Sequence, residues 1–187
     1  MQKGKIICLN GVSSAGKTTL ARALQERLSE PYYWMSEDTF MEMAPKKFVA
    51  DGSDKNDTIW TQAYVNMYHV IKMYSEMGCN TVVDVVLDSD SFLHEIVEIL
   101  HGNPVLFVHV TCPPEELSRR EKVRGNREIG IAVAALPHLC PKDEIYDITV
   151  DTHLNTTEVC ADKIISLLNN SDNFQAFYTL WKRQISL

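Results

Sequence analysis

The chain of 187 residues is long enough for one domain with one hydrophobic core, and we expect residues 1–187 to form a single domain. A formal charge of −7 argues against nucleic-acid binding, because a phosphate backbone calls for a basic surface. No run of about eighteen apolar residues occurs, and the N-terminal apolar stretch is too short for a signal peptide, so we expect neither a membrane span nor a leader. Five cysteines without a C-x-x-C pair indicate reduced thiols in a cytoplasmic protein rather than disulfides or a zinc site.

Apolar, β-branched runs alternate with segments of helical periodicity along the chain. The predicted strands are residues 5–10, 32–36, 81–87, 105–110 and 146–151. The predicted helices lie near residues 17–29, 57–77, 89–101, 113–124 and 155–169. Several of the strands are apolar nearly throughout, which is typical of a parallel sheet covered on both faces. The alternation therefore predicts an α/β fold, a three-layer α/β/α sandwich around a mostly parallel five-stranded sheet.

Two of the helical segments carry further expectations. In the helix at 57–77, apolar residues recur at helical spacing and form a stripe that we interpret as core: Trp60, Ala63, Tyr64, Met67, Val70, Ile71 and Tyr74. His69 lies off this stripe and is expected to be exposed. The aromatic segment at about 171–187 predicts a helical tail, which would pack either on its own domain or on a second copy in a homodimer.

The stretch from Gly11 to Thr18 matches the phosphate-binding pattern G-x-x-x-x-G-K-[ST] between a strand and a helix. Glycines let backbone N–H groups turn inward around an anion, and the helix that follows adds the positive end of its dipole. Lys17 would reach the β- and γ-phosphates, and the Thr18 hydroxyl would ligate Mg²⁺. The predicted nucleotide-binding residues are Gly11, Ser13, Ser14, Ala15, Gly16, Lys17, Thr18 and Thr19. The alternative is an empty glycine-rich turn, but the context predicts a P-loop nucleoside triphosphate hydrolase fold of the kinase-like kind, with ATP and Mg²⁺ as cofactors.

A basic segment at 119–127 favours a kinase over a GTPase switch. The chain has no N-K-x-D motif for guanine recognition, whereas Arg120, Arg124 and Arg127 are spaced to share one helix face. Converging guanidinium groups on a closing lid stabilise the charge of a transferring phosphoryl group, and Gly125 would supply a hinge. The alternative is a solvated basic helix end.

Asp38 follows the second strand, at the edge where ligands collect in open α/β sheets. A carboxylate there could act as the general base for an acceptor hydroxyl, the alternative being a helix N-cap. Trp34, Phe40 and Met41 could wall an apolar acceptor pocket or pack in the core. Asp84, an ionisable residue in an apolar strand, could lie on the Mg²⁺ side of the site or make a structural hydrogen bond.

Together these stretches resemble the chloramphenicol phosphotransferases and their relatives among small P-loop kinases. The resemblance rests on the P-loop, on D-[ST]-x-x-E-x-x-P from Asp38 through Glu42 to Pro45, on the lid R-x-x-x-R-G-x-R and on "YDITVDT", in the same order over most of the chain. It implies a kinase that uses Mg·ATP to phosphorylate a hydroxyl of a small molecule, with Asp38 as base and Glu42 beside the acceptor. The sequence departs from the family in three places: Asp84-Val85 in place of an acidic doublet, Asn126 in place of aspartate, and the aromatic tail.

Three functions are compatible with these residues. The first is an ATP-dependent O-phosphotransferase acting on a neutral, partly apolar molecule, because the only basic residues near 34–50 are Lys46 and Lys47. The second is a kinase of another metabolite, in the manner of shikimate, gluconate or adenylylsulfate kinases. The third is a nucleotide-binding regulator without a small-molecule acceptor, against which Asp38 and the lid arginines argue.

Overall fold

The computed structural model describes residues 2–46, 54–125, 129–170 and 174–186, and all the strands in these ranges lie in one parallel sheet. The strands are β1 (Ile6–Asn10), β2 (Tyr32–Ser36), β3 (Asn80–Val85), β4 (Val105–Thr111) and β5 (Ile148–Asp151). Their order across the sheet is β2-β3-β1-β4-β5, with the P-loop strand β1 at the centre. Each neighbouring pair runs parallel, as in Asn10 beside Val85 and Ser36 beside Asp84, so all carboxyl ends share one edge.

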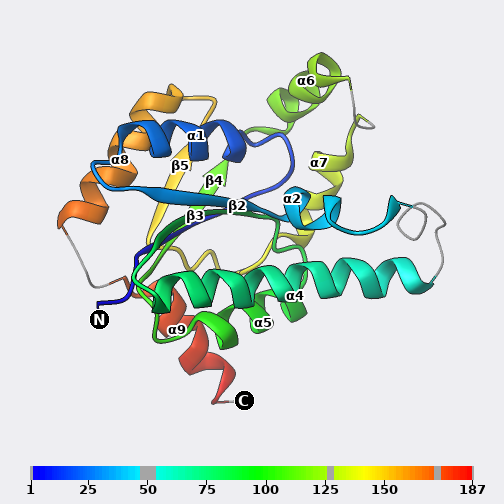
Figure 1. Cartoon of the computed structure of the whole chain (residues 1–187). Helices are drawn as coiled ribbons and strands as arrows, with labels where there is room; N and C mark the ends of the chain where they lie inside the picture. The colour runs from blue at the N-terminus through cyan, green and yellow to red at the C-terminus, as the bar shows by residue number, and fades with distance from the viewer. Residues whose placement is uncertain (1, 47–53, 126–128, 171–173, 187) are drawn as a thin grey trace.

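Helices cover both faces of the sheet (Figure 1). On one face lie α1 (Lys17–Arg27) and α8 (Thr157–Asn170), and on the other lie α4 (Asp54–Glu76), α5 (Asp90–Leu100) and α9 (Ala176–Gln184). The short α2 (Glu37–Glu42), α6 (Pro114–Arg124), α7 (Ile131–Ala135) and the 3-10 turn Leu136–His138 lie towards the carboxyl edge of the strands. The predicted three-layer α/β/α sandwich is confirmed.

Two apolar clusters hold the layers together. Ile7, Leu9 and Val108 point towards α1 and α8, whereas Cys8 and Phe107 point towards α4, α5 and α9. Because alternate residues of a strand face opposite sides, a strand covered on both faces must be apolar throughout. This explains why the strand sequences do not alternate.

The C-terminal tail packs on its own domain. Phe177 and Leu180 of α9 are buried in the cluster below the sheet, and the Phe177 ring meets the Phe107 ring edge-on at 4.9 Å between centroids. The Trp181 ring stacks on His101 with 4.7 Å between centroids. The structure thus has the tail packed on its own domain, and the homodimer stays a prediction.

Several details differ from the sequence prediction. The sequence did not predict α2 or α7, because helices of six and five residues are too short to produce a periodic apolar pattern. The N-cap of α2 is Ser36, whose hydroxyl accepts a hydrogen bond from the Thr39 N–H at 3.3 Å, so the alternative reading of Asp38 as the cap is wrong. On α4, the fully buried Tyr68 was missing from the predicted stripe, while His69 is exposed as expected.

All five cysteines are free thiols, as the sequence predicted. Four of them, Cys8, Cys112, Cys140 and Cys160, are buried as small apolar side chains. In the described ranges, we find no helix with the length and hydropathy that crossing a bilayer would need.

Candidate active site

The carboxyl edge of the sheet brings together residues that lie far apart in the sequence. The P-loop follows β1, Glu37 and Asp38 follow β2, Asp84 lies near the end of β3, and Thr152 follows β5. These residues, with Arg120 and Arg124 of α6, line a cleft of about 450 Å³. From the P-loop and the first turn of α1, the cleft lining contains Ser13, Ser14, Gly16, Lys17, Thr18 and Thr19.

The conformation of the P-loop depends on its glycines. A Cβ at Gly11 would lie 2.4 Å from the carbonyl oxygen of Val110, so the loop passes too close to β4 for any side chain there. Gly16, directly before α1, has a φ of 94°, which favours glycine, and no side chain caps the helix. The first N–H groups of α1 are therefore not used by a capping side chain, which makes this helix end suitable for an anion.

Lys17 and Thr18 connect the P-loop to Asp84. The buried Lys17 Nζ donates to the carbonyl oxygens of Gly11 and Val12 at 2.8 and 3.1 Å and lies 3.5 Å from Asp84 Oδ1. The Thr18 hydroxyl donates to Asp84 Oδ2 at 2.7 Å. The two residues that the sequence suggested as metal ligands thus lie together, and Asp84 also makes the structural hydrogen bond of the alternative reading.

Two carboxylates of α2 line the same cleft as the P-loop. Asp38 is exposed, whereas Glu37 is partly buried and its Oε1 accepts a hydrogen bond from the Val86 N–H at 3.1 Å. The pKa of Glu37 is raised to about 8, mainly by burial and in smaller part by Asp84 and Asp88, while the hydrogen bond from Val86 and the charge of Lys17 oppose the shift. The sequence reasoning missed Glu37, although its position beside Asp38 after a strand was a usable signal.

The raised pKa of Glu37 predicts a measurable pH dependence of stability. A carboxyl whose pKa is higher in the folded protein favours folding at low pH, and this contribution is lost as pH rises towards the folded pKa of about 8. Glu37→Gln removes the ionisation and retains an oxygen that can accept from Val86. Solvent screening at this partly exposed group reduces the effect. We expect the difference in Tm, variant minus wild type, to be about 4 °C larger at pH 8.5 than at pH 5. Thermal melts at both pH values measure this, and a constant difference in Tm would contradict it.

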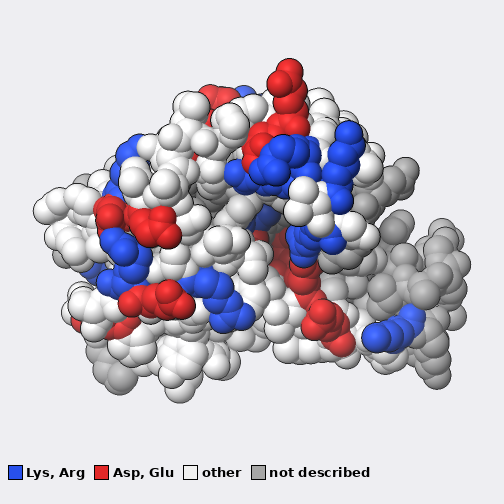
Figure 2. Space-filling view, turned by 90° about the horizontal axis from the view of Figure 1, so that it is seen from above, with Lys and Arg blue, Asp and Glu red and all other residues white. Residues whose placement is uncertain are grey.

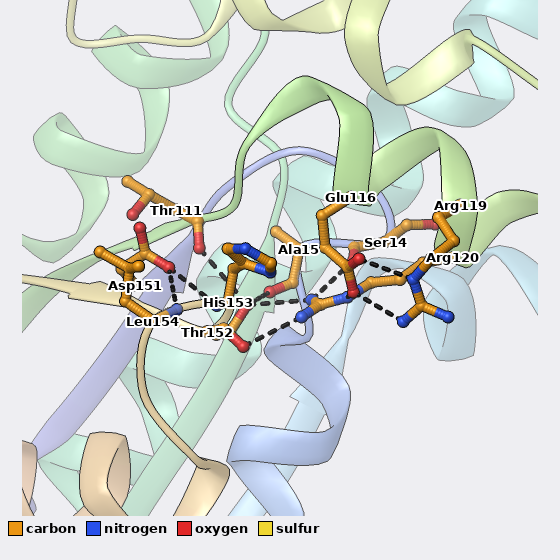
Figure 3. A network of polar contacts seen from close by, with 10 residues as sticks. All are labelled: Ser14, Ala15, Thr111, Glu116, Arg119, Arg120, Asp151, Thr152, His153 and Leu154. Carbon is orange, nitrogen blue, oxygen red and sulfur yellow. Dashed lines mark hydrogen bonds and ion pairs between the residues drawn. The ribbon is translucent and has the colours of Figure 1, made fainter.

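Arg120 joins the P-loop to the end of β5 through its guanidinium (Figure 3). Its guanidinium donates to the Ser14 carbonyl at 3.3 Å, to the Thr152 hydroxyl and carbonyl at 2.9 Å each, and to Glu116 at 2.8 Å. Glu116 also pairs with Arg119, and the hydrogen bonds from the two arginines lower its pKa to about 2. In this conformation the guanidinium of Arg120 is therefore bonded to protein groups, although the residue lines the cleft.

The other lid arginines have different positions. Arg124 is exposed and lines the cleft, and Gly125 ends α6 with a φ of 66°, a conformation that favours glycine. Arg127 and Asn126 lie outside the described residues. Figure 2, which looks down on the molecule, shows basic side chains gathered beside a stripe of acidic ones, and both kinds line the cleft.

The residues suggested as acceptor-binding walls are absent from the described lining of the cleft. Trp34 faces α1, where the guanidinium of Arg22 lies 3.9 Å from its ring centre, and Phe40 packs against the core below the sheet. Met41 is buried, and Glu42 is exposed beyond the cleft. Trp34 and Phe40 thus pack in the core, which was the second possibility that the sequence offered, because their positions on β2 and α2 direct them into the protein.

A phosphate loop after the central strand, with carboxylates from the neighbouring strand ends in the same cleft, defines a P-loop kinase-like phosphotransferase. Comparisons with known proteins agree with this class. Residues 4–169 match the family described as "Chloramphenicol phosphotransferase-like protein", and the chain belongs to this family.

One curated relative and two solved structures illustrate these similarities. The chain is 29% identical to "Putative O-phosphotransferase Rv2636" of Mycobacterium tuberculosis over an alignment of 209 residues, which covers 100% of this chain and 92% of the relative. Among solved structures, it resembles the M. tuberculosis APS kinase CysC in complex with AMPPNP and APS, with a TM-score of 0.70, 17% identity and 90% and 99% of the two chains covered. It also resembles the Acinetobacter baumannii shikimate kinase in complex with shikimate, with a TM-score of 0.66, 18% identity and 90% and 95% covered. At these identities the solved structures support the fold alone.

Proposed function

We propose that this protein transfers the γ-phosphoryl group of ATP to a hydroxyl of a small, neutral, partly apolar molecule, with chloramphenicol as the first acceptor to test. The observation that carries the proposal is the presence of Asp38 and Lys17 in one cleft at the carboxyl edge of the sheet. One end of that cleft suits a polyphosphate, and the other offers an exposed carboxylate to an acceptor. The free thiols of the chain suit a reducing cytoplasm as the place of this activity.

The proposed step is a direct displacement at phosphorus. The acceptor oxygen attacks the γ-phosphorus and forms a new P–O bond, while the bond from the γ-phosphorus to the β–γ bridging oxygen breaks and ADP leaves. The proton of the acceptor hydroxyl goes to the Asp38 carboxylate. Lys17 would leave the carbonyls of Gly11 and Val12 for the β- and γ-phosphates and offset their charge.

Thr18 and Asp84 fit a magnesium ion. Their oxygens are hard donors that already lie 2.7 Å apart, and Mg²⁺ in such sites typically uses one or two protein oxygens together with phosphates and waters. When bound, the ion would supply positive charge to the β- and γ-phosphate oxygens. The residues of the chain then have the separate tasks of holding the nucleotide and accepting the proton.

Among the lid arginines, Arg124 is the better candidate for a phosphate contact. Arg120 already donates four hydrogen bonds to Glu116, Ser14 and Thr152. The exposed Arg124 lies one turn further along α6, lines the cleft and precedes Gly125. We therefore assign the transition-state charge to Lys17 and Arg124, and we assign Arg120 to the support of the P-loop.

The charge of the cleft favours a neutral acceptor over the anionic acceptors of shikimate, gluconate and adenylylsulfate kinases. Glu37, Asp38 and Asp84 all line it. The described cations in the lining are Lys17, Arg120 and Arg124, which the nucleotide and the P-loop would engage. An acceptor carboxylate or sulfate beside Asp38 would meet like charge without a compensating cation.

A panel of acceptors tests the proposal. We expect ADP release and a new phosphate ester, observed by ³¹P NMR, with chloramphenicol or another neutral alcohol and not with shikimate, gluconate or adenylylsulfate. Transfer to one of the anionic acceptors would replace the proposal with the metabolite-kinase alternative. Slow ATP hydrolysis without an ester from any acceptor would favour the regulator alternative.

A further inference from the structure

Thr152 contacts the P-loop although the two are far apart in the sequence. It follows β5, and its N–H donates to the Thr111 carbonyl at 3.1 Å, which extends the β4–β5 pairing by one residue. Its hydroxyl donates to the Ala15 carbonyl at 2.7 Å and accepts from Arg120 Nη1 at 2.9 Å (Figure 3). One side chain thus links the end of β5 and the lid helix α6 to the backbone of the phosphate loop.

The contact to a carbonyl has a consequence for the next N–H group. A peptide unit is planar, and in a trans peptide its C=O and N–H point in opposite directions. The described chain has its only cis peptide at Cys140–Pro141, so the Ala15–Gly16 peptide is trans. A hydrogen bond that fixes the Ala15 carbonyl therefore also fixes the direction of the Gly16 N–H, away from Thr152.

The neighbouring peptide is held in the same way. Arg120 donates to the Ser14 carbonyl at 3.3 Å, on the peptide that carries the Ala15 N–H. Ser14 has a φ of 61°, in the left-handed region that side chains rarely adopt, and such a residue needs support from its surroundings. Arg120 provides such support at the Ser14 carbonyl, and Thr152 provides it at the next carbonyl, that of Ala15.

We propose that Thr152 is a positioning residue for phosphate binding: its hydroxyl, held by Arg120, fixes the Ala15–Gly16 peptide so that the Gly16 N–H faces the bound phosphates. This inference rests on one part of the proposed function, the binding of a nucleotide at the P-loop, and does not depend on the acceptor. Hydrogen bonds from N–H groups to phosphate are charge-assisted and sensitive to direction. A peptide that is free to rotate would bind phosphate more weakly.

Thr152→Val tests this with a side chain of nearly the same shape and no hydroxyl. Thr152→Ser keeps the hydroxyl, and Thr111→Val is a matched control, because the Thr111 hydroxyl donates to Val150 rather than to the P-loop. Calorimetric titration with inorganic pyrophosphate and Mg²⁺ measures the phosphate cradle without a base or an acceptor. We expect Thr152→Val to weaken this binding about tenfold, Thr152→Ser to stay within about twofold of wild type, and Thr111→Val to match wild type.

Each result decides for or against the proposal. Thr152→Val binding pyrophosphate as wild type does would overturn it, and so would equal losses in Thr152→Val and Thr111→Val, which would indicate general packing. Should the valine variant unfold early in a thermal melt, Thr152→Ala removes the hydroxyl without adding a methyl group and is read in the same way. Wild-type protein that binds pyrophosphate but phosphorylates no acceptor would refute the proposed function alone, whereas wild type that binds neither pyrophosphate nor ATP would refute both.

Discussion

Replacement of Asp38 by asparagine is expected to lower the rate of phosphoryl transfer by a factor on the order of 10² or more, with nucleotide affinity nearly unchanged. Asparagine has almost the same shape as aspartate, but its amide does not accept the proton that the acceptor hydroxyl loses. The nucleotide contacts are expected from other residues of the cleft, Lys17 and the P-loop. The loss should therefore fall on kcat and leave the affinity for Mg·ATP in place.

Calorimetry with Mg·ATP and acceptor-dependent ADP release would separate these two quantities. Glu95→Gln is a control for the loss of one carboxylate, since Glu95 is exposed on α5 and outside the described lining of the cleft. Undiminished turnover in Asp38→Asn would remove the assignment of the base. If Glu37→Gln were inactive at the same time, the base would be Glu37, the second carboxylate that α2 places in the cleft.

The parts of the site that the sequence predicted are those that lie close together along the chain. Gly11, Gly16, Lys17 and Thr18 fall within eight residues, and each has a physical reason to occupy its place between a strand and a helix. The fold followed from a similarly local signal, because strands covered on both faces are apolar throughout. The parallel arrangement of the strands also predicted that Asp38 and Asp84, which lie at the carboxyl ends of β2 and β3, share one edge of the sheet.

The parts that the sequence reasoning missed depend on contacts between distant segments. The Thr152 hydroxyl meets a carbonyl 137 residues away, and Glu37 meets the Val86 N–H 49 residues away. No local pattern announces either contact, since threonine and glutamate are ordinary surface residues. The direction of Trp34, one of the suggested acceptor walls, also depends on a distant segment: whether it faces the cleft or α1 depends on how α1 lies over β2, and Arg22 of α1 covers its ring.

The same dependence applies to the lid. The spacing of Arg120 and Arg124 placed both on one face of a helix, but it did not reveal that Arg120 would bind the Ser14 carbonyl and Thr152. Two arginines one turn apart thus have different surroundings, one held against the P-loop and one exposed beside the cleft. Helical spacing predicts which side chains share a face but not the partner that each one reaches.

Lys17→Met is expected to reduce both nucleotide binding and transfer, by about tenfold or more in affinity and by a factor on the order of 10² to 10³ in kcat. The buried Lys17 Nζ is the cation at the centre of the site, within hydrogen-bonding distance of two P-loop carbonyls and 3.5 Å from Asp84. Methionine has a similar length and no charge, so the phosphates would lose their main counter-charge. Arginine should not restore function, because its planar guanidinium is larger and does not match the position of a compact ammonium group.

Lys163→Met, which removes an exposed lysine of α8, controls for the change in net charge. The informative comparison is with Asp38→Asn, because the two variants remove charges of opposite sign from one cleft. If the cleft is an active site, Lys17→Met weakens Mg·ATP binding measured by calorimetry while Asp38→Asn does not, and both lose turnover. A Lys17→Met protein that binds Mg·ATP as tightly as wild type would show that the phosphates lie elsewhere, and the roles assigned to Thr18, Asp84 and Thr152 would fail with it.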